Sequence, residues 1–151
     1  MPEKHKSVAG IPASVREVRG WLDDALTAAG FGGIDVAVLL VSELVTNSID
    51  HSESAGAGGK IHVLLKTLPG QWIQVEVRDA GVAYKPGAMG NWHDGALQLP
   101  EADAEGGRGL YLVANLSDTF GWDTKGGMFW FRLLWTEPAE AQAAHLQEAL
   151  W

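Results

Sequence analysis

The twelve residues VSELVTNSIDHS, positions 41–52, place four polar side chains within a stretch that otherwise has the character of a core helix. On an α-helix each residue turns about 100°, so Glu43, Asn47, Asp50 and His51 fall within an arc of roughly 100°. An apolar stripe lies opposite, as in a helix packed on a core. It consists of Val38, Val41, Leu44, Val45 and Ile49. One side of this helix is predicted to pack, and the other to present a carboxylate and a carboxamide.

Length and charge limit what those groups can meet. The chain has 151 residues, no cysteine and a formal net charge of −8. This length predicts one domain, residues 1–151, with a single core. The acidic balance argues against direct binding of nucleic acid, which requires neutralisation of phosphates. The first residues lack the apolar segment of a signal peptide, and no apolar run approaches a membrane span. We therefore expect a cytoplasmic protein that does not contact a membrane.

Capping residues and hydrophobic periodicity predict the elements. Ser14 and Glu17 have capping-box spacing, and Gly30 is placed to end the helix that they begin. Asp35 is the expected cap of the helix that runs to His51. Further periodicity predicts strands over 7–11, 60–68, 71–79, 119–124 and 128–135, and helices over 109–118 and 139–151.

This order of elements predicts an α+β fold, a two-layer α/β sandwich with helices on one face of a mixed, mostly antiparallel sheet. The core is expected over residues 14–135, followed by a C-terminal tail of residues 136–151. The last strand, MFWFRLLW, is largely apolar on both faces, with Phe129 and Phe131 on one and Trp130 on the other. The second face is either covered by the tail or available for docking of a partner, including a second copy in a homodimer.

The first motif with chemical content is Glu43-x-x-x-Asn47. The carboxamide oxygen of Asn47 is a hard ligand suited to Mg²⁺, and the Glu43 carboxylate can orient or deprotonate a nucleophile. An ordinary solvent-exposed polar face would contain the same two residues. The pair alone therefore leaves a catalytic site and a solvated helix face equally open.

The second motif is VEVRDAG, in which Asp79 and Gly81 stand where a strand runs out. A carboxylate at a strand end can accept a hydrogen bond from an exocyclic amine. A nearby glycine lets a flat base approach the backbone. Taken alone, Asp-Ala-Gly is more often an ordinary turn.

The third motif is EGGRGLYLV, in which Gly106, Gly107 and Gly109 immediately precede or open an apolar helix. The free N–H groups and the positive dipole end of such a helix suit phosphate groups. A plain flexible hinge is the alternative, and the closeness of the glycines to the helix start favours the phosphate site.

In this order the three motifs resemble the N, G1 and G2 boxes of the GHKL ATPases, the superfamily that includes gyrase and the histidine kinases. The segments VSELVTNSIDHS, VEVRDAG and GGRGLYLVANLSDTFGW are most similar to the bacterial anti-sigma-factor serine kinases. The resemblance covers roughly residues 14–135. It implies the Bergerat ATP-binding fold, with ATP and Mg²⁺ as cofactors.

The resemblance also implies roles for individual residues. Asn47 would coordinate Mg²⁺, and Glu43 would act as the base toward the acceptor hydroxyl. Asp79 would bind the adenine amino group, with Gly81 beside the base. The remaining nucleotide-binding residues would be Gly107, Arg108, Gly109 and Leu110, the first three holding the phosphates.

The implied function is that of a serine/threonine kinase acting as an anti-sigma factor, which binds a sigma factor and phosphorylates an antagonist protein. Ala83 stands where the fuller D-x-G-x-G pattern has a second glycine. A catalytically weak, nucleotide-sensing module that sequesters a regulatory partner therefore remains an alternative.

The segment 82–105 lacks periodicity, and we expect it to form a lid over the nucleotide.

Overall fold

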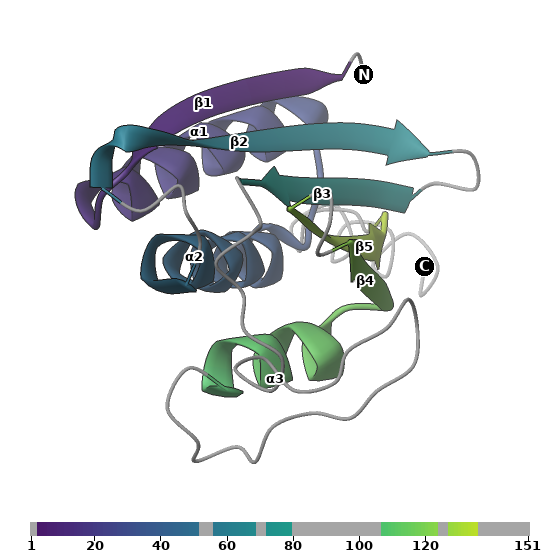
Figure 1. Ribbon diagram of the computed structural model, residues 1–151. Helices are drawn as coiled ribbons and strands as arrows, with labels where there is room; N and C mark the ends of the chain where they lie inside the picture. Colours follow the sequence, from purple (N-terminus) through teal and green to yellow (C-terminus); the bar gives the residue numbers. More distant parts are fainter. Residues whose placement is uncertain (1–2, 52–55, 69–71, 80–106, 124–126, 136–151) are drawn as a thin grey trace, which may run out of the picture.

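The computed structural model describes residues 3–51, 56–68, 72–79, 107–123 and 127–135. These residues form three helices and five strands (Figure 1). The helices are α1 (Ala13–Ala29), α2 (Ile34–His51) and α3 (Gly107–Leu116). The strands are β1 (Lys4–Gly10), β2 (Gly56–Leu68), β3 (Trp72–Arg78), β4 (Thr119–Asp123) and β5 (Met128–Leu134). No helix among these residues is long and apolar enough to cross a membrane.

The five strands form one sheet in the order β1-β2-β3-β5-β4. The sequence predicts a mixed, mostly antiparallel sheet. In the structure all four pairings of the described sheet are antiparallel. The helices lie together on one side of it (Figure 1). The predicted α+β two-layer sandwich is therefore confirmed.

The face of the sheet that meets the helices supplies half of the core. Side chains alternate along a strand, and the helix-facing set on β3 is the buried Ile73, Val75 and Val77, as the sequence predicts. The flanking strands present Val63 and Leu65 on one side and Phe129 and Phe131 on the other, all buried. Each fully buried side chain of this size contributes roughly 1.5–3 kcal/mol of transfer free energy.

The two ends of α1 are fixed by the backbone rather than by polar side chains. The predicted capping box at Ser14 is wrong: the cap position is Pro12, which makes no side-chain hydrogen bond to the helix. Ser14 is instead buried inside the first turn. At the other end Gly30 has a φ of 77°, a conformation that glycine adopts without steric cost. The Gly30 and Phe31 N–H groups close the helix on the carbonyl oxygens of Thr27 and Leu26, which confirms the predicted C-terminus.

The start of α2 also differs from the prediction. Asp35 was the expected cap, but the helix begins at Ile34 and Asp35 lies in its first turn. The Ala37 N–H donates to the Gly33 carbonyl oxygen at 3.1 Å, so the first intrahelical bond starts one residue before Ile34. In the first turn the Asp35 carboxylate still interacts favourably with the positive end of the helix dipole.

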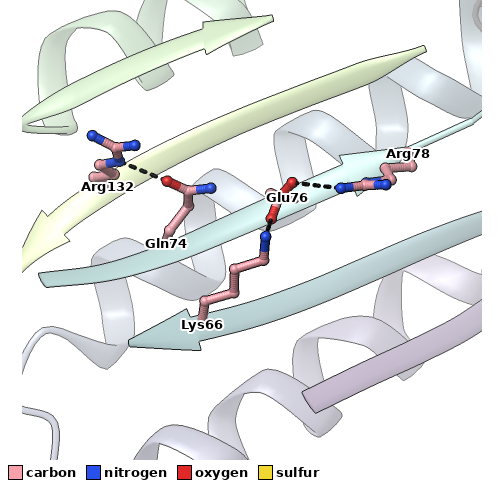
Figure 2. A network of polar contacts seen from close by, with 5 residues as sticks. All are labelled: Lys66, Gln74, Glu76, Arg78 and Arg132. Atoms are coloured by element: carbon pink, nitrogen blue, oxygen red, sulfur yellow. Dashed lines mark hydrogen bonds and ion pairs between the residues drawn. The ribbon is translucent and has the colours of Figure 1, made fainter. Parts of the chain in front are cut away.

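A network of charged groups crosses the other face of the sheet (Figure 2). The Glu76 side chain is 2% exposed and is held by Lys66 Nζ at 2.6 Å and Arg78 Nη2 at 3.0 Å. Arg132 Nε donates to Gln74 Oε1 at 2.6 Å. Burial by itself raises the pKa of the Glu76 carboxyl, but Lys66 and Arg78 outweigh it and hold this pKa below the ordinary value of 4.5.

This network predicts a pH-dependent stability. Because the folded pKa of Glu76 is lowered, its ion pairs stabilise the fold above about pH 4.5, and the contribution is lost as the pH falls through the folded value. Lys66→Met should cost about 1.5–3 kcal/mol at pH 6 and clearly less once Glu76 is protonated. Urea unfolding at pH 6 and at pH 2.5 measures both values.

Lys6→Met is the matched control, because Lys6 pairs with Glu17 at 3.0 Å on a more exposed surface. Removing that pair should cost under about 1 kcal/mol at either pH. An equal cost of Lys66→Met at both pH values would contradict the assigned role of Lys66.

Candidate functional site

The C-terminal half of α2 supports the first motif. Asn47 is only 6% exposed, Glu43 is half-buried one turn earlier, and Asp50 is exposed. The predicted polar face is therefore not a uniformly solvated one: its centre is a buried carboxamide. Buried amides require hydrogen-bond partners, and Asn47 does interact with another group of the protein. The side chain of His51, the last residue of α2, lies outside the described residues.

The opposite side of α2 packs as predicted. Val41, Leu44 and Val45 are at most 1% exposed, whereas Ile49 is half-buried. The burial of this stripe fixes the rotation of the helix about its axis, and with it the direction of Glu43 and Asn47.

Ser48 is a polar residue next to Asn47 that the sequence analysis did not single out. It is fully buried, and its Oγ has no hydrogen-bond partner among the described residues. The hydroxyl of Ser42, one and a half turns earlier, instead donates to the Val38 carbonyl oxygen at 2.6 Å. Its burial could have been predicted from its position, because Ser48 continues the core stripe at i+4 from Leu44 and i+3 from Val45.

The second motif lies where β3 ends. Asp79 follows Arg78 directly, and its N–H donates to the Gly127 carbonyl oxygen at 2.8 Å, just before β5 begins. Strand alternation puts Asp79 on the same side as Val75 and Val77, which is the helix side. Asp79 is half-buried and makes a further interaction within the protein. Gly81 lies outside the described residues.

The third motif forms the first turn of α3. The helix begins at Gly107, two residues before the predicted start, so Gly107, Arg108, Gly109 and Leu110 all belong to it. The first N–H groups of a helix have no partner within the helix, and they carry its positive dipole end. The side chains of Arg108 and Leu110 are not among those described, and neither is the segment 82–105 predicted to form a lid.

The fold brings the three motifs to one end of the molecule. The C-terminal end of α2, the end of β3 and the start of α3 all lie at the left in Figure 1. The helix α2 packs against both α3 and β3, so it is the common neighbour of the other two. A buried carboxamide, a half-buried carboxylate at a strand end and a glycine-rich helix start therefore share one region. Such groups suit a polyanionic ligand that carries a flat, amine-bearing ring.

A hollow formed by the described residues lies elsewhere. It has a volume of about 590 Å³ and is lined by Pro12, by α1 residues from Val15 to Asp23 and by Val38. Val38 and Asn47 are nine residues apart on α2, roughly 13 Å along its axis. This groove is therefore not the region where the three motifs meet.

The described residues form an α+β sandwich with the three motifs at one end. Residues 8–133 match the model of the histidine kinase-like ATPase domain, so the chain belongs to that family, whose members bind ATP. No curated protein matches the sequence closely enough to count as a relative.

Among solved structures, the chain is similar to the crystal structure of the RsbU and RsbW domains of Rv1364c from Mycobacterium tuberculosis. The TM-score is 0.65 at 19% sequence identity. The match covers 92% of this chain and 34% of the other, so this chain spans about a third of that structure's length. At this level of identity the likeness shows a common fold.

The unpartnered hydroxyl of Ser48 generates a prediction about α2. Ser48→Ala removes a buried polar atom that gains no hydrogen bond on folding, and alanine is the better helix former. The free energy of unfolding should rise by about 0.5–1 kcal/mol, as measured by urea denaturation. Ser42→Ala is the matched control on the same helix: it sacrifices an existing bond and should bring no such gain. A loss of stability in Ser48→Ala would mean that the hydroxyl has a partner.

Proposed function

We propose that this chain binds ATP with Mg²⁺ where α2, β3 and α3 meet, and that it is a serine/threonine protein kinase acting as an anti-sigma factor. Its protein partners would be a sigma factor and an antagonist protein that it phosphorylates on a hydroxyl group. The observation that carries this proposal is the pairing on α2 of the buried Asn47 carboxamide with the half-buried Glu43 carboxylate. Membership of the ATPase family and the fold shared with an RsbW domain support it.

The chemistry of the donor groups fits a magnesium nucleotide. Mg²⁺ prefers oxygen ligands and is usually held by one or two protein groups, with phosphates and waters completing its shell. Within the part of the chain that the structure describes, no three His, Asp or Glu side chains gather into a metal site. A single carboxamide oxygen from Asn47 would be a sufficient protein ligand for a Mg²⁺ ion that also binds the phosphates of a nucleotide.

Glu43 has the position expected of a general base. It lies one helical turn before Asn47, on the same side of α2, and it is partly shielded from water. When bound, Mg-ATP supplies the phosphoryl group and the cation that offsets its charge. The protein's own contribution would be to orient the acceptor hydroxyl and take up its proton at the Glu43 carboxylate.

The remaining residues would position the nucleotide. The Asp79 carboxylate would accept a hydrogen bond from the adenine amino group, with Gly81 beside the ring. The first turn of α3, comprising Gly107, Arg108, Gly109 and Leu110, would hold the phosphates through its free N–H groups.

A second candidate function is a nucleotide-sensing module that sequesters a regulatory partner with little catalysis. Ala83, in place of the second glycine of the D-x-G-x-G pattern, favours this alternative. Incubation of the purified chain with labelled ATP and candidate antagonist proteins separates the two functions, because only the kinase transfers label to the antagonist.

The adenine assignment makes a prediction for Asp79. Asp79→Asn replaces one of the two acceptor oxygens by a donor that opposes the adenine amino group. ATP binding should weaken by about 1.5–3 kcal/mol, roughly 10- to 150-fold, because a charge-assisted hydrogen bond is lost. Calorimetric titration of the folded variant measures this. Asp24→Asn, an exposed acid on α1, is the control and should bind as the unmodified chain does. Unchanged affinity in Asp79→Asn would remove the residue from the site.

The different roles proposed for Glu43 and Asn47 on α2 lead to a second prediction. Glu43→Gln should leave nucleotide binding within about two-fold but reduce phosphotransfer by at least about 100-fold, since general base catalysis contributes that much. Asn47→Ala should lose Mg²⁺-dependent binding as well. Thermal melting must accompany both measurements, because Asn47 is buried. If both variants lost binding and transfer in equal proportion while remaining folded, the pair would have a structural role only.

A further inference from the structure

The face of the sheet that points away from the helices is a mixed apolar and cationic surface. Cross-strand pairing defines it: Leu64 and Trp130 flank Glu76, while Lys66 and Arg132 flank Gln74. We call the surface around these six residues the outer face. The described helices all lie on the opposite side of the sheet (Figure 1), so no described helix covers it.

Large side chains on the outer face are in part accessible. Trp130 and Leu64 are half-buried, and Leu134 is 45% exposed at the end of β5. The Arg132 guanidinium carbon lies 4.8 Å from the centre of the Trp130 ring, which is a cation–π contact. Gly121 on β4 leaves room for this ring, because a Cβ there would lie 2.5 Å from it. The outer face therefore presents a partly accessible aromatic platform.

Its charge is opposite to that of the chain as a whole. The outward positions of β2, β3, β5 and β4 contribute four cations, Lys60, Lys66, Arg78 and Arg132, but two carboxylates, those of Glu76 and Asp123. Glu76 is already paired with Lys66 and Arg78 (Figure 2). A protein of net charge −8 thus carries a positive patch on this face, which is complementary to an acidic, apolar segment.

The segment that follows β5 has that composition. Residues 136–151 contain three glutamates, at 137, 140 and 148, and no lysine or arginine. Their apolar residues Ala139, Ala143, Leu146 and Leu150 recur at the spacing of one helix face. An acidic segment with an apolar stripe matches a positive, partly apolar platform in both respects.

The length of this segment also fits. It begins after Trp135, whose ring packs edge-on against the buried Phe31 on the helix side of the sheet, with ring centroids 5.4 Å apart. Thirteen residues from 139 to 151 span roughly 20 Å as a helix. Five strands are about 19 Å across. The segment is therefore long enough to cross the outer face from its own attachment point.

We propose that residues 136–151 dock on the outer face of their own sheet, with Leu146 and Leu150 over the Trp130 platform and the glutamates beside Lys66 and Arg132. In this arrangement the segment is an intramolecular cover. The inference does not depend on the proposed kinase activity.

The test uses thiol labelling of the full chain, which contains no cysteine of its own. Leu64→Cys places one thiol on the outer face, and its labelling rate is measured with and without Leu146→Asp plus Leu150→Asp. Removing the apolar contacts of the cover should speed labelling at least about ten-fold, equivalent to a loss of about 1.4 kcal/mol of docking free energy. Reversing the tail charges with Glu140→Lys plus Glu148→Lys should speed labelling in the same direction. Equal rates with and without the leucine substitutions would overturn the proposal.

Two controls locate the protection. Leu39→Cys, an exposed position on α2, should label at the same rate with either tail sequence. Labelling is also repeated over a hundred-fold range of protein concentration, alongside sedimentation. Protection by the cover is independent of concentration. Protection that grows with concentration as a dimer forms would assign the outer face to a second copy of the chain and would overturn the proposal.

Discussion

The helix α2 is the constraint on which the rest of the structure depends. One side of it must fill the core under a sheet that has helices on a single face, and this burial fixes its rotation. The opposite side carries Glu43 and Asn47, so their directions are set by the packing of Val41, Leu44 and Val45 rather than by the site itself. Any change that rotates α2 alters the core and the site together.

Burial is what distinguishes this helix from an ordinary amphipathic one. A solvated polar face would expose Asn47, whereas the structure leaves it 6% exposed, in a helix that packs against both α3 and β3. A buried amide is costly unless its hydrogen bonds are satisfied, and Asn47 does interact with another group of the protein. The contribution of α3 is its first turn, where glycines lie next to free N–H groups. In this histidine kinase-like ATPase domain the candidate site groups therefore lie on helices and at a strand end.

The two faces of the sheet differ in the residues that they bury. The inner face is largely apolar and packs against the helices. The outer face buries a carboxylate, Glu76, at its centre, and two cations keep that group charged. A buried ion pair offers little net stability, but it is strongly unfavourable to break, so it fixes the pairing of β2 with β3 at this register. The cations that remain give the outer face its positive character within an acidic protein.

The sequence by itself determined the features that depend on local periodicity and on residue chemistry. The alternation at Ile73, Val75 and Val77, the glycine end of α1 and the three motifs with their glycines are all readable along the chain. Only the tertiary structure decided the strand order β1-β2-β3-β5-β4 and the burial of the Asn47 and Ser48 side chains. It also decided that α1 starts directly after Pro12, and not with the predicted cap at Ser14. The reason is that burial and pairing depend on which distant segments come together. His5 on β1 and His62 on β2 are in contact although 57 residues separate them, and no local pattern encodes such a pairing.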